Sequence, residues 1–321
     1  MRQGRVRTAL VAGVALTMAI AAPAGAITNG RADDEEHPYV GELFYHVPDD
    51  VDSRFDAPGS WFSCSGTLLT PTVVLTAGHC TFGTGRNGDA TTEDGGWGGN
   101  DVWVSFDEEP DFEGIDPDPF IPDDNAGRYV HYRDTLDARE SWHRGTAYPH
   151  DHFDNDQFWL ADAGVIILEE PFVPQVEPGE PTEAELPDPG YLDQFIGRTK
   201  AHTLFEAVGY GVEGSLPIRE FGGDTRMTSE QVILNANGVY GVHDESSIVF
   251  SNNRGRPHTG GTCSGDSGGP FLGNDTNLLV AVNSYGVQPN CTGGDGAYRM
   301  DQPDALRWIN AVLDGDDPRI E

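Results

Sequence analysis

Two short segments contain the residue types that hydrolysis of an acyl bond requires. His79 lies in LTAGHC, residues 75–80, and Ser267 lies in GTCSGDSGGP, residues 261–270. A serine hydroxyl is a weak nucleophile at neutral pH, and a neighbouring histidine has a suitable pKa to remove its proton. The two segments therefore predict nucleophilic catalysis, in which Ser267 attacks and His79 acts as the general base.

A base of this kind needs a third group that fixes its tautomer and stabilises the imidazolium. Asp162 opens the segment DAGVIIL and directly enters a predicted apolar strand, whereas Asp154 and Asp156 lie close by but do not. An aspartate before a strand is common on its own. The order His, Asp, Ser along one chain is far more specific, and we predict that Asp162 orients His79.

Glycines surround the candidate nucleophile. Ser267 is flanked by Gly265, Gly268 and Gly269. Glycine allows unusual backbone dihedrals and a close approach of substrate. The N–H groups of Gly265 and Ser267 can then point at one oxyanion, which hydrolysis through a tetrahedral intermediate requires.

LTAGHC and GDSGGP resemble the histidine and serine motifs of the chymotrypsin/trypsin family of serine proteases. The resemblance extends over nearly all of the chain after residue 26, including ITNG at 27–30, SYG at 284–286 and the terminal helix. It implies an all-β fold of two six-stranded antiparallel barrels, with the triad in the cleft between them. By counting alone, four cysteines allow three pairings. The resemblance implies the disulfides Cys64–Cys80 and Cys263–Cys291.

The resemblance also implies a substrate pocket with Gly261 at its base. Trypsin-like members place an aspartate there, so a strong preference for Arg or Lys is not expected. Family members that prefer glutamate usually have a histidine just before the Ser-Tyr-Gly strand, and in this chain that residue is Asn283. Gly286 and Gly296 match wall positions that leave the pocket open when they are small, so a large apolar or aromatic side chain is predicted on the acyl side of the cleaved bond. Asp295 is close enough in sequence to favour a basic one instead. The predicted pocket residues are Gly261, Thr262, Ser284, Tyr285, Gly286 and Gly296.

The chain begins like an export signal. Three arginines precede the apolar run 8–22, and Ala24-Gly25-Ala26 fits the small-residue cleavage rule. Cleavage there makes Ile27 the new N-terminus, and in the resembling family such an ammonium group pairs with the aspartate next to the catalytic serine, here Asp266. Export itself would then activate the enzyme. The alternative is a cut a few residues away, with Ile27 only the first strand residue.

The net charge of the chain limits the kinds of partner that it can bind. The chain has 19 Lys and Arg against 53 Asp and Glu, a formal net charge of −34. Nucleic acids and anionic membranes need a basic face, so neither is an expected partner. We expect a secreted monomer that acts on proteins or peptides and stays off the membrane once its signal is removed. Disulfides persist outside the cell, and the chain lacks the Cys-x-x-Cys spacing of many zinc sites.

The spacing between the motifs departs from the resembling family. His79 and Asp162 are 83 residues apart, and the excess falls in the acidic stretch 87–127, which holds thirteen acids and no Lys or Arg. We expect surface loops there, apart from the strand 102–106. Clustered carboxylates leave calcium binding open, but no EF-hand pattern is present. YPHDHFD at 148–154 has metal-ligand residue types, but it occupies an ordinary loop of the family, so no metal is expected there.

The elements that must position these residues are short strands. Apolar runs bounded by Gly, Pro, Asn and Asp predict strands at 102–106, 164–168, 207–211, 247–250 and 278–286. Asp301 and Pro303 suit the start of one clear helix. The predicted divisions are a signal at 1–26, a barrel carrying His79 and Asp162 at 27–170, a linker at 171–190, a barrel carrying Ser267 at 191–300, and a helix at 301–314.

Two other functions compete with a protease. A catalytically silent homologue would keep the barrels as a binding or scaffold protein, but such relatives usually lose a triad residue, and all three are present. An esterase on an α/β-hydrolase fold predicts a Gly-x-Ser-x-Gly elbow followed by Asp and then His. The order His, Asp, Ser and the scarcity of helices disfavour it.

Overall fold

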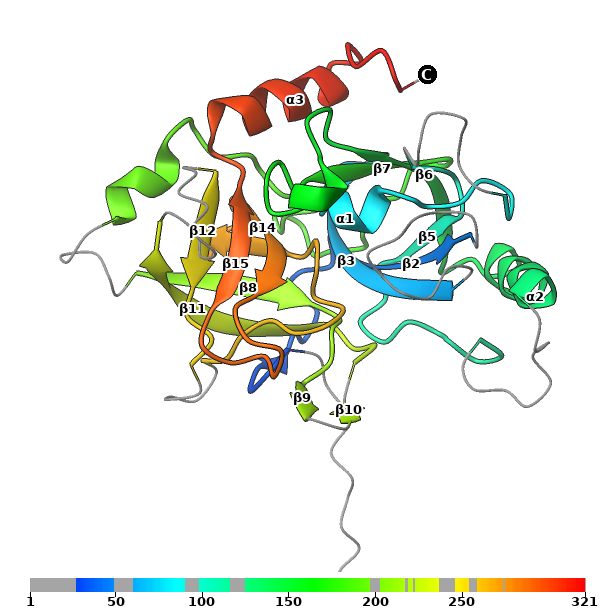
Figure 1. Ribbon diagram of the computed structural model, residues 1–321, viewed down its shortest axis with the longest axis horizontal. Helices are drawn as coiled ribbons and strands as arrows, with labels where there is room; N and C mark the ends of the chain where they lie inside the picture. Colours follow the sequence, from blue (N-terminus) through cyan, green and yellow to red (C-terminus); the bar gives the residue numbers. More distant parts are fainter. Residues whose placement is uncertain are drawn as a thin grey trace, which may run out of the picture.

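The chain folds into two antiparallel β-barrels that lie side by side (Figure 1). The computed structural model describes residues 27–48, 60–89, 98–115, 125–196, 203–216, 219–221, 223–236, 246–253, 259–273 and 275–320. The predicted signal at 1–26 lies outside these residues. The two six-stranded barrels and the terminal helix confirm the fold class expected from sequence.

The first barrel is closed by six strands in the order β2-β3-β4-β7-β6-β5. Two of its strands lie at the apolar runs predicted at 102–106 and 164–168, and Leu43, Val74 and Ile166 are fully buried inside the barrel. The chain enters and leaves each strand at turns rich in Gly, Pro and Asp. The strands are β2 (Val40–Val47), β3 (Ser60–Thr70), β4 (Val73–Thr76), β5 (Val102–Ser105), β6 (His143–Pro149) and β7 (Gly164–Leu168).

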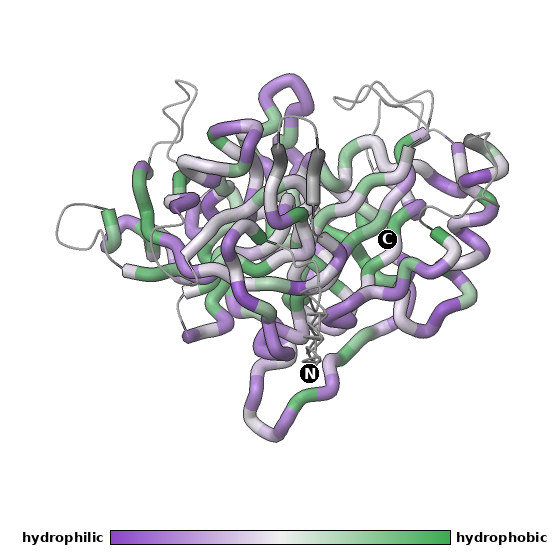
Figure 2. Tube along the Cα trace, turned by 90° about the horizontal axis from the view of Figure 1, so that it is seen from below, coloured by the Kyte–Doolittle hydropathy of each residue, from purple (hydrophilic) through white to green (hydrophobic). Residues whose placement is uncertain are grey.

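The second barrel is closed by the pairing of β8 with β11. Phe250 and Phe271 stack at its centre with ring centroids 4.0 Å apart. The strands in sheet order are β11 (Met227–Asn235), β12 (Ser247–Phe250), β15 (Asp295–Arg299), β14 (Leu279–Gly286), β13 (Pro270–Gly273) and β8 (Leu204–Gly209). A separate hairpin joins β9 (Gly214–Leu216) to β10 (Arg219–Phe221). In Figure 2 hydrophilic segments lie mostly in the outer loops.

The first described residues join the second barrel rather than the first. β1 (Arg31–Ala32) pairs with β11, and Ile27 is fully buried in the apolar core of the second barrel. Residues 27–32, assigned from sequence to the first barrel, therefore pack with the second. The reason is the apolar side chain of Ile27, which is buried against Phe205 and its neighbours in that core.

Of the two longer helices, α2 (Asn125–Asp137) and α3 (Pro303–Leu313), the sequence predicted only α3. α3 buries Trp308 and Ile309, as its 3–4 spacing predicts. Its N-cap is Gln302, not Asp301, because the Asp301 carboxylate instead accepts hydrogen bonds from the backbone of Leu192 and from Arg299. The remaining helical turns are α1 (Gly78–Thr81), η1 (Asn155–Gln157) and η2 (Tyr191–Phe195).

The predicted linker touches both barrels. Ala184 donates its backbone N–H to Leu68 of the first barrel at 2.8 Å. The next residue, Glu185, donates to Asn277 and accepts from Leu279 of the second barrel, each at 2.8 Å. The segment thus contributes to the docking of the barrels. Among the described residues, no helix has the length and apolar character needed to cross a lipid bilayer.

A buried ionic network fastens the start of the chain to both barrels. Arg226 is fully buried and donates to Asp33 at 2.7 Å, to the Tyr210 hydroxyl at 2.9 Å and to the Phe106 carbonyl at 2.9 Å. His37 lies 2.6 Å from the other oxygen of Asp33. Burial alone would raise the pKa of Asp33, but His37 and Arg226 lower it to about 2.

Loss of the Arg226 guanidinium should therefore destabilise the whole fold. Removing one partner of a buried pair costs about 3–5 kcal/mol, because the other charge stays buried. We expect Arg226→Met to lower the free energy of unfolding by that amount in urea titrations. Arg133→Met is the control, since Arg133 pairs with Asp134 at the surface and should change stability by less than about 1 kcal/mol. Equal effects of the two variants would contradict the role given to the network.

Candidate active site

His79 is placed by a single helical turn and a disulfide. β4 ends at Thr76, and α1 follows at once with Ala77 as its N-cap. The adjacent Cys80 is bonded to Cys64 of β3, as the resemblance implied. His79 keeps only 7% of its surface exposed. Its ring is therefore fixed at the inner edge of the first barrel, facing the second.

Asp162 is the carboxylate that meets this ring. Its Oδ2 lies 2.9 Å from Nδ1 of His79, and its Oδ1 accepts the backbone N–H of His79 at 2.9 Å. A third donor, the hydroxyl of Ser284, comes from β14 of the second barrel. Asp154 instead caps η1 by accepting the backbone N–H of Asp156. The structure therefore brings Asp162, among the three candidate carboxylates, to His79.

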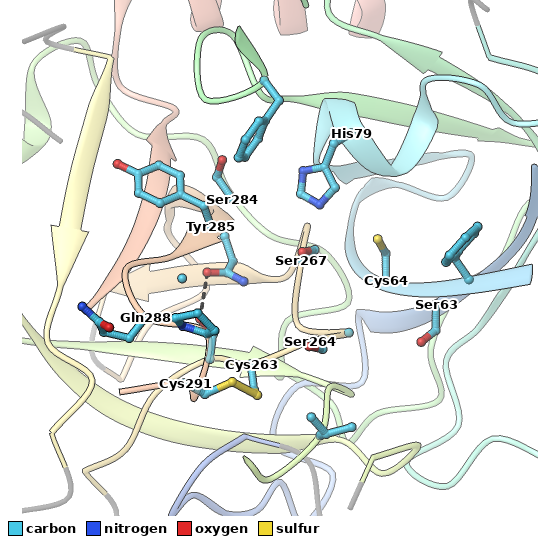
Figure 3. Close-up of a pocket in the computed structure, with 18 of the residues that line it drawn as sticks. Ser63, Cys64, His79, Cys263, Ser264, Ser267, Ser284, Tyr285, Gln288 and Cys291 are labelled. Carbon is cyan, nitrogen blue, oxygen red and sulfur yellow. Dashed lines mark hydrogen bonds between the residues drawn. A yellow bond between two sulfur atoms is a disulfide. The ribbon is translucent and has the colours of Figure 1, made fainter. Parts of the chain in front are cut away.

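Ser267 lies on a tight loop that faces His79 across one cleft (Figure 3). The cleft has a volume of about 700 Å³. The loop is held close to the first barrel, because the Ser267 carbonyl accepts the N–H of Ser65 at 2.7 Å. Gly268 is required there: its φ is +84°, and a Cβ would lie 2.0 Å from the hydroxyl oxygen of Thr76.

Backbone hydrogen bonds of the same loop fix the orientation of the N–H groups of Gly265 and Ser267. The Ser264 carbonyl accepts from Val212 at 2.8 Å, and the Asp266 carbonyl accepts from Gly269 at 3.0 Å. In a trans peptide the N–H points opposite to the C=O. The N–H groups of Gly265 and Ser267 therefore point away from those partners, on residues that both line the cleft. Gly265 has φ +95°, a dihedral that favours glycine.

Four of the six predicted pocket residues line the cleft: Thr262, Ser284, Tyr285 and Gly286. Gly261 and Gly296 are not among the described residues that line it. A Cβ on Gly261 would lie 2.0 Å from the Asn252 side chain, and a Cβ on Gly296 would lie 2.1 Å from the Tyr285 ring. Both glycines thus make room for another side chain of the protein. The disulfide Cys263–Cys291 also lines the pocket.

Two buried polar residues, Asp295 and Asn252, lie behind the pocket. Asp295 is 1% exposed and accepts from the backbone of Thr262 at 2.7 Å, from Asn252 at 3.0 Å and from Gln231 at 3.0 Å. Burial raises the pKa of this carboxyl to about 6, although these hydrogen bonds oppose the shift. Sequence reasoning missed Asn252, because nothing near it in the chain signals that it will meet Gly261.

One polar pair lies within the pocket itself. The hydroxyl of Thr262 donates to the side-chain oxygen of Asn283 at 2.9 Å. The part of the pocket surface formed by described residues carries no Asp, Glu, Lys or Arg side chain.

Ile27 and Asp266, the predicted activation pair, both lie behind the pocket. Thr28 pairs with Gly261 through backbone hydrogen bonds of 2.9 and 3.1 Å, so the start of the described chain supports the pocket base. The buried carboxylate of Asp266 accepts from the backbone of Gly211 and of Cys263, each at 2.8 Å. Burial raises its pKa to about 8 against the effect of these bonds.

Two groups of potential metal ligands occur among the described residues. In Cys64, His79 and Cys80 the two sulfurs are bonded to each other and are not available. His150, His152 and Asp304 offer ligand atoms within 4.8 Å of one another, where the loop 148–154 meets α3. In the described part of the acidic stretch, no three carboxylates converge as calcium would require.

Comparison with known sequences agrees with this geometry. The sequence profile of the family described as Trypsin matches residues 131–309, more than half of the chain. Serine protease 1 and Serine protease 2 of Drosophila melanogaster are each 25% identical over 287 residues. Each alignment covers 89% of this chain and 84% of the relative.

Solved structures share the fold at lower identity. HL collagenase superposes with a TM-score of 0.57 and 20% identity, covering 90% of this chain and 99% of the other. The scabies mite inactivated protease paralogue S-D1 gives a TM-score of 0.55 and 15% identity, covering 90% and 98%. At these identities the likeness shows the fold alone.

Proposed function

Because the chain belongs to the trypsin family of serine proteases, we propose that it is an active endopeptidase that cleaves peptide bonds through a covalent acyl-enzyme. One observation carries the proposal. The buried pair of His79 and Asp162 faces Ser267 across a single cleft. Its substrates are then proteins and peptides.

In this proposal each residue takes a role that its chemistry and contacts support. An ionised carboxylate only accepts hydrogen bonds, so Asp162 fixes the proton of His79 on Nδ1 and leaves Nε2 as the base. Ser267 Oγ attacks the carbonyl carbon while His79 takes its proton. The N–H groups of Gly265 and Ser267 stabilise the oxyanion. His79 then protonates the leaving amine. Water next attacks the acyl-enzyme ester while His79 takes its proton, and His79 returns a proton to Ser267 Oγ as the ester bond breaks.

The competing function is a catalytically silent homologue. The fold cannot decide between them, because a structure named as an inactivated protease paralogue superposes on this chain as well as HL collagenase does. The side chains favour the enzyme. All three triad residues are present, and Asp162 and His79 are already hydrogen-bonded.

Active-site labelling tests the triad directly. We expect a fluorophosphonate probe to label the protein that begins at Ile27, and Ser267→Ala to abolish labelling. Asp162→Asn should lower kcat by about 10³–10⁴-fold, because it favours the wrong histidine tautomer. Asp154→Asn, in the same loop but bonded within η1, is the matched control and should stay near wild type. A folded wild-type protein that is not labelled and cleaves no peptide would be a silent homologue.

We further propose a preference for large apolar or aromatic side chains at P1, the residue on the acyl side of the cleaved bond. The described lining is uncharged and includes Tyr285, Phe158 and a disulfide. A charged P1 side chain would be desolvated there without a partner. Asp295 does not supply one, because its oxygens accept from the pocket wall and from residues behind it.

A peptide series that differs only at P1 measures this preference. We expect kcat/KM for Phe, Tyr or Leu to exceed that for Arg by at least about tenfold, the effect of roughly 1.4 kcal/mol. Asp295→Asn should leave the ranking unchanged. A preference for Arg or Lys that weakens in Asp295→Asn would instead show that the buried carboxylate acts on the substrate.

The third part of the proposal is secretion with activation by signal removal. The charged and apolar segments before Ile27, and two disulfides, support export. The freed ammonium of Ile27 would serve as a partner for Asp266, whose carboxylate is otherwise buried among backbone donors. N-terminal sequencing of the secreted protein should read from Ile27.

This activation has a pH signature. Unfolded Asp266 loses its proton near pH 4, whereas the folded carboxyl keeps it to about pH 8. The folded state binds more protons over that range, so stability should fall as pH rises from about 4 to about 8. We expect this fall, by urea unfolding, in a Ser267→Ala chain that retains residues before Ile27. A chain that begins at Ile27 should show a smaller fall in stability, since the ammonium group of Ile27 keeps the Asp266 carboxylate ionised.

Asp266→Asn in the longer chain provides the control and should flatten the same dependence. Identical pH profiles for the two N-termini would exclude the pairing.

A further inference from the structure

A second hollow opens next to the catalytic cleft. It has a volume of about 420 Å³ and shares Trp61, Phe62 and Ser63 of β3 with that cleft. The two cavities therefore adjoin along one strand. The described residues that line the second hollow are Phe44, Trp61, Phe62, Ser63, Phe112, Ile115, Arg128, Tyr132 and Asp224.

The hollow lies on the leaving-group side of the nucleophile. Figure 3 shows Ser63 on one side of Ser267, with Gln288 and Cys291 of the P1 pocket on the other. A substrate with its P1 side chain in that pocket directs the residues after the cleaved bond toward Ser63. From Ser63 to Trp61, β3 advances by about 7 Å, the length of two residues of extended peptide. The hollow is thus within reach of the second to fourth residues after the bond, P2′ to P4′.

Aromatic rings form its wall. Trp61 stacks on Phe44 with centroids 5.0 Å apart and an interplanar angle of 20°. Phe112 meets Phe44 edge-on at 5.4 Å, and Tyr132 meets Trp61 edge-on at 5.2 Å. Aromatic pairs in such geometries gain binding free energy beyond that from buried apolar area, so these rings favour a further aromatic ring. Among the described lining residues the charged ones are one Arg and one Asp, whose charges cancel.

The wall is held in place by the insertion between β5 and β6. Trp103 donates its indole N–H to Asp137, at the end of α2, at 2.8 Å. Trp142 donates to the Asp111 carbonyl at 3.1 Å, and His131 lies 2.8 Å from the Gly114 carbonyl. These bonds fix both α2 and the loop before it to the barrel. A site whose walls are ordered in advance loses less entropy on binding.

We propose that this hollow is a specificity subsite for one aromatic side chain of the substrate at P2′, P3′ or P4′. The inference rests on the proposed protease function and adds a second determinant to it. The insertion between β5 and β6 thereby contributes to substrate choice through Phe112, Ile115 and Tyr132.

The wild-type enzyme tests the subsite without any mutation. In quenched fluorescent peptides with a fixed P1, Phe is placed in turn at P2′, P3′ and P4′ in an Ala background. At one of these positions Phe should raise kcat/KM about five- to tenfold over Ala, and Asp should not. Equal rates for Phe and Ala at all three positions would overturn the inference.

A pair of variants locates the effect. Phe112→Ala should remove most of the Phe advantage on the long peptides. Its effect on an ester substrate that ends at P1 should be much smaller, since that substrate has nothing after the cleaved bond. Val130→Ala, on α2 but 44% exposed and outside the hollow, is the matched control and should keep the advantage. A Phe advantage that survives in Phe112→Ala would place the recognition elsewhere.

The outcomes separate the two proposals. Cleavage of peptides without any preference after the bond rejects only the subsite, whereas failure to cleave any peptide or ester rejects the protease function itself.

Discussion

The arrangement of the two barrels depends on one buried carboxylate. Asp162 is fully buried and receives two hydrogen bonds from His79 and one from Ser284. A charge in such a place is tolerable only when donors replace its lost hydration. Since His79 belongs to the first barrel and Ser284 to the second, the requirement is met only when the barrels dock in this register. The contacts that satisfy Asp162 thus link the docking of the barrels to the position of His79.

The need of buried carboxylates for hydrogen-bond donors also fixes the pocket loop. Two consecutive backbone N–H groups, those of Thr262 and Cys263, donate to the buried carboxylates of Asp295 and Asp266. The raised pKa of each carboxyl reports the cost of burying it. In this very acidic chain, some of the described acids are therefore buried, and these two fix the backbone at the site. The free ammonium proposed for Ile27 would act on one of these two anchors.

Local signals in the sequence were enough to predict several strands, and long-range contacts were not visible in it. GVIIL is a strand at the predicted residues because its pattern is self-contained. Asp162 could be chosen over its neighbours because it enters that strand. Asn252 and Gly261 could not be matched, since their contact arises only when the barrel closes. Similarly, the register shift between Asn283 and Tyr285 directs the Tyr285 ring toward Gly296, which a motif cannot show.

The long insertion leaves the triad intact for a geometric reason. It departs from β5 and returns to β6, and these strands are paired neighbours, with Val104 opposite His143. Its two ends are therefore already adjacent, and added length costs little closure entropy. The inserted residues pack their aromatic side chains on the outer face of β2 and β3, against Phe44 and Trp61, rather than into the barrel core. Because Trp61 also borders the catalytic cleft, the insertion can reshape the surface that substrates meet without moving His79 or Asp162.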